Sequence, residues 1–358
     1  MRRLNLSLLT LTIALSLVGR TVADELTDAE RWFRDHTARL AEQAAADERQ
    51  VVQGGRDYLY FVPELRHLGV GAFWGERAAD VSRARNADWA DPLPAIVDFH
   101  EQARRAGVEL VFVPVPAKAT IYPDHLPDAR ATDELARLDR AHRRFLDELR
   151  DRDVTVLDLT DAFLDHRAAT DDAEDERLYC KQDTHFSPRG AELAAKRIAA
   201  LVAEQGWLDD SAERREHTTR RIELTIDGDL RGMLNEPDLP RETLPATQII
   251  DAATDAPPEL DRDSPVLLLA DSHGLVFHAG GDMHARGAGL ADHLAHRLQH
   301  PIDLIAVRGS GATPSRLQLF RRRDELAGKR VVVWSMSVRE YTEGDGWRLI
   351  PVVPEAGR

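Results

Sequence analysis

One stretch decides the fold of this 358-residue chain: residues 266–274, which read Val-Leu-Leu-Leu-Ala-Asp-Ser-His-Gly. Its first five residues are continuously apolar, which is typical of a strand buried on both faces of a parallel sheet. The stretch then becomes polar at Asp271 and Ser272, and Gly274 permits a tight turn there. Other apolar or β-branched runs predict further strands at residues 58–62, 109–114, 154–159, 302–307 and 331–334.

Amphipathic segments alternate with these strands. Helical spacing of apolar residues predicts helices at residues 24–53, 94–106, 133–150, 188–204 and 314–326. Buried strands that alternate with amphipathic helices imply a parallel sheet covered on both faces. The sequence therefore predicts an α/β fold of three layers (α/β/α) with a mainly parallel sheet. Residues 207–262 break the alternation and predict a small inserted segment, with a strand at 221–226.

The first residues have the order of a secretory signal peptide. Arg2 and Arg3 precede an uncharged, mostly apolar run over residues 4–19, and Thr-Val-Ala at 21–23 gives a small-x-small ending. We expect residues 1–23 to be cleaved on export to the periplasm, with an uncleaved inner-membrane anchor as the alternative. The remaining chain is expected to comprise an N-terminal helix (24–53), the main α/β domain (54–345, with the insertion at about 207–262) and a C-terminal tail (346–358).

Composition excludes several classes of function. The formal net charge of −15 and the pI near 5.4 argue against nonspecific binding to nucleic acid or anionic lipid, so no nucleic-acid partner is expected. The single cysteine, Cys180, rules out an intramolecular disulfide and a cysteine-rich zinc site, and we expect it to be buried. Six histidines lie between residues 273 and 300, but their spacing fits no ligand pattern. We therefore expect neither a metal nor a cofactor.

Candidate site residues follow the predicted strands, where ligands bind in an open parallel sheet. Ser272 lies where backbone N–H groups can face an oxyanion, although a serine at a strand end is more often a turn or helix-cap residue. Asp183 and His185 are two residues apart, so in an extended segment both side chains point the same way. The carboxylate can then orient an imidazole that serves as a base, whereas the simpler alternative is a solvated loop histidine.

A third candidate segment continues the predicted strand at 109–114. Lys118 and Tyr122 leave that strand in a loop stiffened by prolines at positions 114, 116 and 123. Such a loop suits the wall of a cleft, so both side chains are predicted to face the ligand.

Short motifs then follow one another over about residues 50–341. They are Gly55-Arg-Asp-Tyr-Leu-Tyr-Phe61, Pro63-Glu-Leu-Arg66, Val115-Pro-Ala-Lys118, Tyr122-Pro123, Leu126-Pro127, Asp183-Thr-His-Phe-Ser-Pro188, Gly228-Asp-Leu230, Ala270-Asp-Ser272, Gly309-Ser-Gly-Ala312, Val331-Val-Val-Trp334 and Arg339-Glu340. In this order and spacing, the chain resembles the SGNH-hydrolase-like domain of the alginate O-acetyltransferases of the AlgJ/AlgX type. In that family the Asp-x-His pair precedes the serine, the reverse of ordinary SGNH esterases, and this chain has the same permuted order.

The resemblance implies a triad of Ser272 as nucleophile, His185 as general base and Asp183 as the residue that orients it. Three features depart from the family pattern. Ala270 replaces the usual glycine, His273 follows the nucleophile, and the opening motif reads Asp57-Tyr-Leu-Tyr60 where the family has a Gly-Trp-Leu-Phe-like sequence. The oxyanion and substrate site is expected to involve His273, the loop Gly309, Ser310 and Gly311, and also Lys118, Tyr122 and Arg339. For Arg339 a structural ion pair is the alternative.

The implied activity is transfer of an acetyl group, through an acyl-enzyme, to hydroxyls of an exopolysaccharide. By the same resemblance, the partners are the polysaccharide acceptor and a membrane-bound acyltransferase that supplies the acetyl group. Two alternatives stay open: a secreted carbohydrate acetylesterase, in which water attacks the acyl-enzyme, and a non-catalytic scaffold of an export complex that retains only the fold. The sequence gives neither the polymer nor the oligomeric state.

Overall fold

The computed structural model describes residues 26–354, apart from residues 131–135, 209–213 and 237; the expected signal peptide lies outside this range. At its centre is a five-stranded sheet in the order β4-β3-β9-β7-β8, in which every neighbouring pair is parallel. The strands are β3 (Glu109–Val115), β4 (Thr155–Val156), β7 (Val266–Ala270), β8 (Asp303–Ala306) and β9 (Val331–Ser337). The predicted α/β fold with a mainly parallel sheet is confirmed.

The central strands show why their sequences are apolar. β9 lies between β3 and β7, so that Trp334 is paired with Phe112 on one side and with Leu269 on the other. Every residue of β7 and β9 is buried. Because neither face of these strands reaches water, each buried valine or leucine contributes roughly 1.5–3 kcal/mol to folding.

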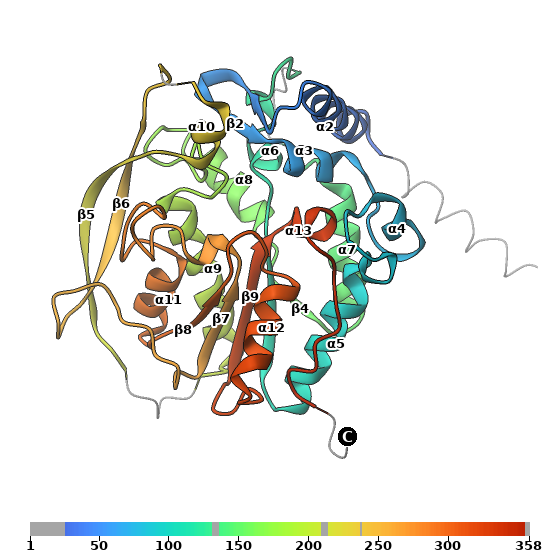
Figure 1. Ribbon diagram of the computed structural model, residues 1–358. Helices are drawn as coiled ribbons and strands as arrows, with labels where there is room; N and C mark the ends of the chain where they lie inside the picture. Colours follow the sequence, from blue (N-terminus) through green and yellow to red (C-terminus); the bar gives the residue numbers. More distant parts are fainter. Residues whose placement is uncertain (1–25, 131–135, 209–213, 237, 355–358) are drawn as a thin grey trace, which may run out of the picture.

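Helices cover both faces of the sheet, with α9 and α11 on one face and α5, α7 and α12 on the other (Figure 1). Their bounds are α5 (Pro92–Arg105), α7 (Arg140–Arg150), α9 (Pro188–Gln205), α11 (Leu290–Leu298) and α12 (Thr313–Arg322). α9 begins at a cap in which the Ser187 hydroxyl accepts a hydrogen bond from the Gly190 N–H, and it ends at Gly206 in the left-handed conformation. Further helices are α8 (Thr160–Ala169) and the four-residue α4 (Ala78–Val81), α6 (Lys118–Ile121) and α13 (Glu340–Glu343).

The N-terminal region differs from the sequence prediction. The helix expected over 24–53 is α2 (Asp28–Ala46), and residues 51–53 form strand β1 (Val51–Gln53) instead. β1 pairs antiparallel with β2 (Leu59–Phe61), so the strand predicted at 58–62 belongs to a separate hairpin and not to the main sheet. α3 (Val62–Gly69) follows at once and packs against α2.

The inserted segment forms a two-stranded ribbon. β5 (His217–Ile226) pairs antiparallel with β6 (Glu242–Asp251), and α10 (Asp229–Leu234) lies between them. The strand predicted at 221–226 is therefore the second half of a longer strand. Gly228 joins the ribbon to the site described below, because a Cβ at this position would lie 2.1 Å from the carbonyl oxygen of Gln182.

Other elements are shorter than predicted. The strand expected at 154–159 is only β4, and α7 and α12 end or begin inside their predicted ranges. The expected C-terminal tail is packed where it is described, since Trp347, Ile350 and Val352 are buried. Cys180 is buried, as predicted. Among the described residues, no helix combines the length and the apolar character that crossing a bilayer requires.

Candidate active site

Ser272 is held at the carboxyl end of β7 by a short turn. The turn is the 3-10 helix η5 (Ser272–Gly274), capped by Asp271, whose Oδ1 accepts a hydrogen bond from the His273 N–H at 2.8 Å. Asp271 Oδ2 accepts a second bond from the Ser337 N–H at 2.8 Å, which ties the turn to the end of β9. Glycine is needed at Gly274, because a Cβ there would lie 2.7 Å from the Cβ of Ala270.

His185 reaches Ser272 from a segment 87 residues away. His185 Nε2 lies 2.7 Å from Ser272 Oγ, and His185 Nδ1 lies 2.6 Å from Asp183 Oδ1. Because Nδ1–H donates to the carboxylate, Nε2 is left to accept the hydroxyl proton of Ser272. The structure thus brings together the three residues of the expected triad in the order that a serine nucleophile requires.

Asp183 receives four hydrogen bonds. Its Oδ1 accepts from His185 Nδ1 and from the His185 N–H at 3.0 Å. Its Oδ2 accepts from the Asp229 N–H and from His284 Nε2, each at 3.0 Å. Burial alone would raise the pKa of Asp183, but His185 and then His284 outweigh it and hold the pKa well below its usual range. The carboxylate is therefore ionised and fixed in orientation.

The pKa of His185 is raised above its usual value. Burial by itself would lower the pKa, but the charge of Asp183 and its hydrogen bond to Nδ1 act in the opposite direction and are larger together. A raised pKa makes the imidazole a stronger base toward the Ser272 proton.

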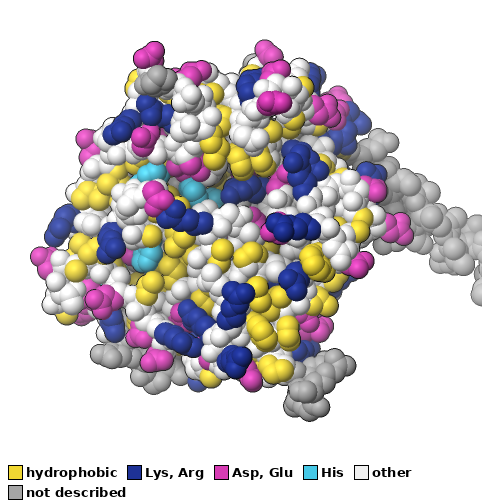
Figure 2. Space-filling view, in the orientation of Figure 1, with side chains coloured by type: hydrophobic (Ala, Val, Ile, Leu, Met, Phe, Trp, Pro, Cys, Tyr) yellow, Lys and Arg dark blue, Asp and Glu magenta, His cyan; other side chains and the backbone are white. Residues whose placement is uncertain are grey.

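Ser272 and His185 open into a cavity of about 370 Å³. Its walls combine charged and apolar side chains: Arg308, Arg339, Glu340, Glu343, Phe61, Met233 and Met283. On this face, histidine side chains lie beside basic side chains, with apolar side chains next to them (Figure 2). Guanidinium groups can donate hydrogen bonds to the hydroxyl or carboxylate oxygens of a ligand, and the apolar side chains offer contact area.

Four further expected residues lie at or beside this cavity. Gly309 and Arg339 line it. Ser310 Oγ donates a 2.5 Å hydrogen bond to Glu340 Oε2. Burial raises the pKa of Glu340 to about 7, so this wall changes its charge near neutral pH. Gly311 packs against the turn before Ser272, because a Cβ there would lie 2.8 Å from the Asp271 nitrogen.

Lys118 and Tyr122 do not line the cavity, so this prediction was wrong. Lys118 is buried, and its Nζ donates to three backbone carbonyl oxygens, those of Leu59, Lys181 and Asp183. Tyr122 is fully buried, and its hydroxyl accepts a hydrogen bond from the Leu178 N–H. The loop after β3 turns inward beneath the Asp183 segment, which a strand-end position does not reveal.

His273 is also placed differently from the expectation. It is 1% exposed and does not line the cavity. Its ring packs edge-on against His185 and Phe186, and its Nδ1 lies 3.1 Å from Asp271 Oδ1. Burial lowers the pKa of His273, and the nearby Asp271 opposes this only in part. His273 therefore packs behind the site as a neutral side chain.

Asp229 and His284 are site residues that the sequence analysis missed. Asp229 belongs to a motif shared with the resembled family, but its backbone contact with Asp183 has no sequence signal of its own. His284 belongs to the group of histidines for which the spacing indicated no role.

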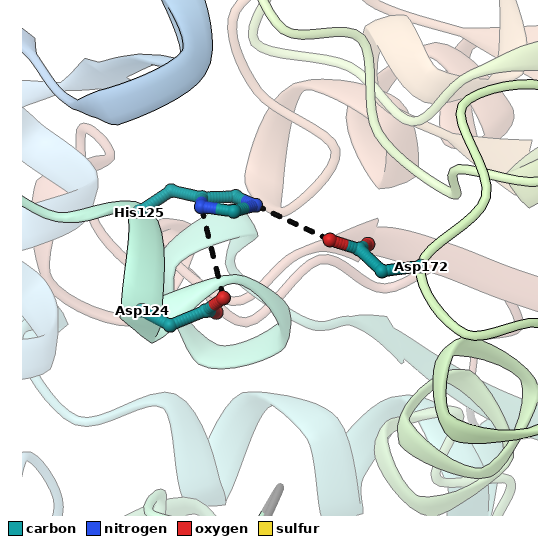
Figure 3. A group of neighbouring side chains, drawn as sticks. All are labelled: Asp124, His125 and Asp172. Atoms are coloured by element: carbon teal, nitrogen blue, oxygen red, sulfur yellow. Dashed lines mark ion pairs between the residues drawn. The ribbon is translucent and has the colours of Figure 1, made fainter. Parts of the chain in front are cut away.

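A second group of acidic and histidine side chains lies away from the triad. His125 Nδ1 lies 3.6 Å from Asp124 Oδ2, and His125 Nε2 lies 3.4 Å from Asp172 Oδ2 (Figure 3). The guanidinium of Arg167 binds both oxygens of Asp124 at 2.7 Å and Asp172 Oδ1 at 3.0 Å. Because Arg167 already supplies positive charge to both carboxylates, we interpret this group as an ion-pair network.

Comparison with known proteins shows the family of the chain. The family described as "SGNH hydrolase-like domain, acetyltransferase AlgX" matches residues 73–338. A probable alginate O-acetylase AlgJ from Pseudomonas aeruginosa is 33% identical over 162 residues, which are 44% of this chain and 38% of the relative. A probable alginate O-acetylase AlgJ from Pseudomonas putida is 27% identical over 255 residues, 69% of this chain and 62% of the relative. The chain thus spans less than two thirds of these relatives.

Solved structures show the same fold. The O-acetyltransferase domain of Pseudomonas putida AlgJ superposes with a TM-score of 0.61 at 21% identity, covering 82% of this chain and 92% of that one. Pseudomonas aeruginosa AlgX also gives a TM-score of 0.61, at 15% identity, covering 93% of this chain and 72% of that one.

Proposed function

From the premise that this chain belongs to the family of AlgX-type SGNH hydrolase-like acetyltransferase domains, we propose that it is an O-acetyltransferase that carries the acetyl group on Ser272. One observation carries the proposal: Asp183, His185 and Ser272 form a hydrogen-bonded chain that ends at a cavity. Such a chain is the arrangement that activates a serine for acyl transfer.

In the first step, Ser272 Oγ attacks the acetyl carbonyl while His185 Nε2 takes its proton. The negative charge on the carbonyl oxygen is stabilised by the backbone N–H of Ser272 and by N–H groups of the Gly309–Gly311 loop, because the His273 and Gly274 N–H groups already donate to Asp271. His185 then returns the proton to the leaving group, and an acetyl-Ser272 ester remains. Asp183 stays ionised throughout and stabilises the imidazolium.

In the second step, His185 Nε2 takes a proton from an acceptor hydroxyl, and the hydroxyl oxygen attacks the acetyl ester. The C–O bond to Ser272 breaks, and Ser272 regains the proton from His185. If water takes the place of the acceptor, the same residues release acetate. The acceptor therefore decides between transferase and esterase.

We propose a polysaccharide as the acceptor and the periplasm as the compartment. Arg308 and Arg339 on the cavity wall suit a ligand rich in hydroxyl or carboxylate oxygens. The signal-peptide pattern of residues 1–23 supports export. The acetyl group would then come from a membrane-bound acyltransferase partner, as the family resemblance implies.

The full chain and its Ser272→Ala variant test the proposal. Each is given a chromogenic acetyl ester, with and without uronic-acid and neutral oligosaccharides, and acetate release and sugar mass are followed together. We expect Ser272-dependent gain of acetyl mass on a sugar. Ser272-dependent acetate release with no sugar gaining mass favours the acetylesterase. Equal rates from both proteins contradict the serine mechanism and favour the non-catalytic scaffold.

A further inference from the structure

A second histidine, His284, contacts the triad carboxylate. Its Nε2 lies 3.0 Å from Asp183 Oδ2, the oxygen that His185 does not use. The His284 side chain is only 9% exposed. We propose that His284 is a positioning residue of the acyl-transfer site: it donates Nε2–H to Asp183 Oδ2, fixes the carboxylate plane and limits the basicity of His185. This inference rests on the proposed function of Ser272.

The loop that carries His284 is built to hold this contact. His284 has a φ of +72°, in the left-handed region, which costs a non-glycine residue roughly 1–2 kcal/mol. Backbone hydrogen bonds compensate: the Phe277 N–H donates to the Met283 carbonyl, and the His284 N–H donates to Gly281. The ring also packs against Phe277, with 5.5 Å between ring centres. A strained backbone held by its surroundings next to a catalytic carboxylate points to a functional constraint.

Two carboxylates, those of Asp183 and Asp282, face His284, and the guanidinium of Arg308 pairs with Asp282. Asp183 lies on the segment before α9, Asp282 on the same loop as His284, and Arg308 after β8. Arg308 binds both oxygens of Asp282. The two carboxylates favour a donor at His284 Nε2, and Arg308 offsets the charge of Asp282. Among the described residues, the hydrogen bond from Nε2 to Asp183 Oδ2 is the polar contact that holds the His284 ring.

The contact affects the pKa of His185, because the negative charge of Asp183 is distributed over its two oxygens. A donor on Oδ2 draws negative charge from Oδ1, so Oδ1 stabilises the protonated form of His185 less than an otherwise free carboxylate would. Removing that donor raises the pKa of His185. Since the base must be deprotonated to act, the acid limb of the pH–rate profile then moves to higher pH.

Two variants and one control test the inference in the full chain, with Ser272-dependent hydrolysis of a chromogenic acetyl ester as the readout. His284→Leu keeps the volume and removes the donor, whereas His284→Gln keeps an N–H donor. The control is His278→Gln on the same loop: His278 Nδ1 lies 3.0 Å from Asp292 Oδ1, an equivalent contact that does not involve the triad.

For His284→Leu we expect kcat to fall about three- to ten-fold with little change in KM, and the acid limb to rise by about half a pH unit. In His284→Gln the acid limb of the pH–rate profile should lie within about 0.2 pH unit of that of the wild type. In His278→Gln the acid limb should not move. An unmoved limb in His284→Leu, or the same shift in all three variants, would overturn the inference.

A measurement on the unmodified protein covers the case in which His284→Leu does not fold. NMR of the imidazole nitrogens should show His284 protonated at Nε2 at neutral pH, with a slowly exchanging proton. A deprotonated Nε2 contradicts the inference. If ester hydrolysis does not depend on Ser272, the proposed function fails instead, and the NMR result still decides whether His284 holds Asp183.

Discussion

Two Asp-x-His turns lie side by side in this molecule, and only one has the geometry of a catalytic pair. In the first, Asp183 Oδ1 accepts from the His185 N–H at 3.0 Å and from Nδ1 at 2.6 Å. In the second, Asp271 Oδ1 accepts from the His273 N–H at 2.8 Å and lies 3.1 Å from Nδ1. The centres of the two imidazole rings are 4.9 Å apart.

The two turns differ in what the Nε2 atom of each histidine contacts. His185 Nε2 faces Ser272, whereas His273 Nε2 is buried without a hydrogen-bond partner among the described residues. The pKa of His185 is raised and that of His273 is lowered, although both rings are buried. The same local motif therefore becomes a base or a packing residue according to the elements around it.

The largest expected difference between the two turns is in the hydrolysis rate when the histidine of each is replaced by glutamine. His185→Gln removes the base, so Ser272-dependent ester hydrolysis should fall on the order of 10⁴-fold. His273→Gln should change the rate per folded molecule by less than about three-fold and lower the free energy of unfolding by about 1 kcal/mol. Equal losses of activity in both variants, at equal folded fractions, would contradict the comparison.

The two carboxylates give the next comparison. Asp183→Asn should lower the hydrolysis rate on the order of 10⁴-fold, because an amide neither orients nor stabilises the His185 imidazolium. Asp271→Asn should act mainly on stability, by about 2 kcal/mol, since Asp271 accepts bonds from the His273 and Ser337 N–H groups. Urea unfolding beside initial rates separates these effects. The prediction fails if Asp183→Asn keeps wild-type turnover.

A substitution of Lys118 tests how much the hydrogen bonds that hold the Asp183 turn contribute to stability. Its buried Nζ bonds the carbonyl of Asp183 and two others, so Lys118→Met leaves buried carbonyl oxygens unpaired. We expect a loss of about 3 kcal/mol in the free energy of unfolding. The exposed Lys196 on α9 is the control, and Lys196→Met should change stability by less than about 0.5 kcal/mol. Similar values for the two variants would show that the Lys118 contacts carry little energy.

The pH dependence of the hydrolysis rate should distinguish His185 from His273. His185 must be neutral to act as a base, and its pKa lies above the ordinary value for histidine, about 6.5. The hydrolysis rate should therefore fall as the pH drops through a pKa above 6.5, and the profile should keep this limb in His273→Gln. A limb below 6.5 in the wild type would contradict the raised pKa.

The pH dependence of the free energy of unfolding should also distinguish the two histidines, although this effect is smaller. The folded-state pKa of His273 is depressed, so only the unfolded chain takes up this proton below about pH 6.5. The contribution of neutral His273 is present above that pH and is lost as the pH falls, by up to about 1.4 kcal/mol per pH unit. Unfolding curves should show a steeper acid loss in the wild type than in His273→Gln; parallel curves would refute the assignment.

The sheet was predictable because its strands have a strong sequence signal, whereas the triad was predictable only from the resemblance to a known family. β3, β7 and β9 are buried on both faces, which forces continuous apolar runs. The edge at which parallel strands end made Ser272 a candidate, and the family resemblance, with its permuted Asp-x-His order, then implied Asp183 and His185 as its partners.

The features that the sequence did not predict depend on contacts between residues far apart in the chain. Residues 51–53 were placed in a helix because an alanine-rich helix precedes them, whereas pairing with β2 makes them a strand. Lys118 was placed in the cleft because a strand end does not show which way its loop turns. His284 meets Asp183 across 101 residues through a left-handed backbone angle, and neither is visible in the sequence.

The most direct test of the account is to trap the acyl-enzyme. The full chain and Ser272→Ala are mixed with a chromogenic acetyl ester, quenched with acid within the first turnover and weighed by intact-protein mass spectrometry, and the modified peptide is then sequenced. The account predicts a gain of one acetyl group on the wild type alone, located on Ser272. Acetylation at another residue, or equal acetylation of both proteins, would contradict it.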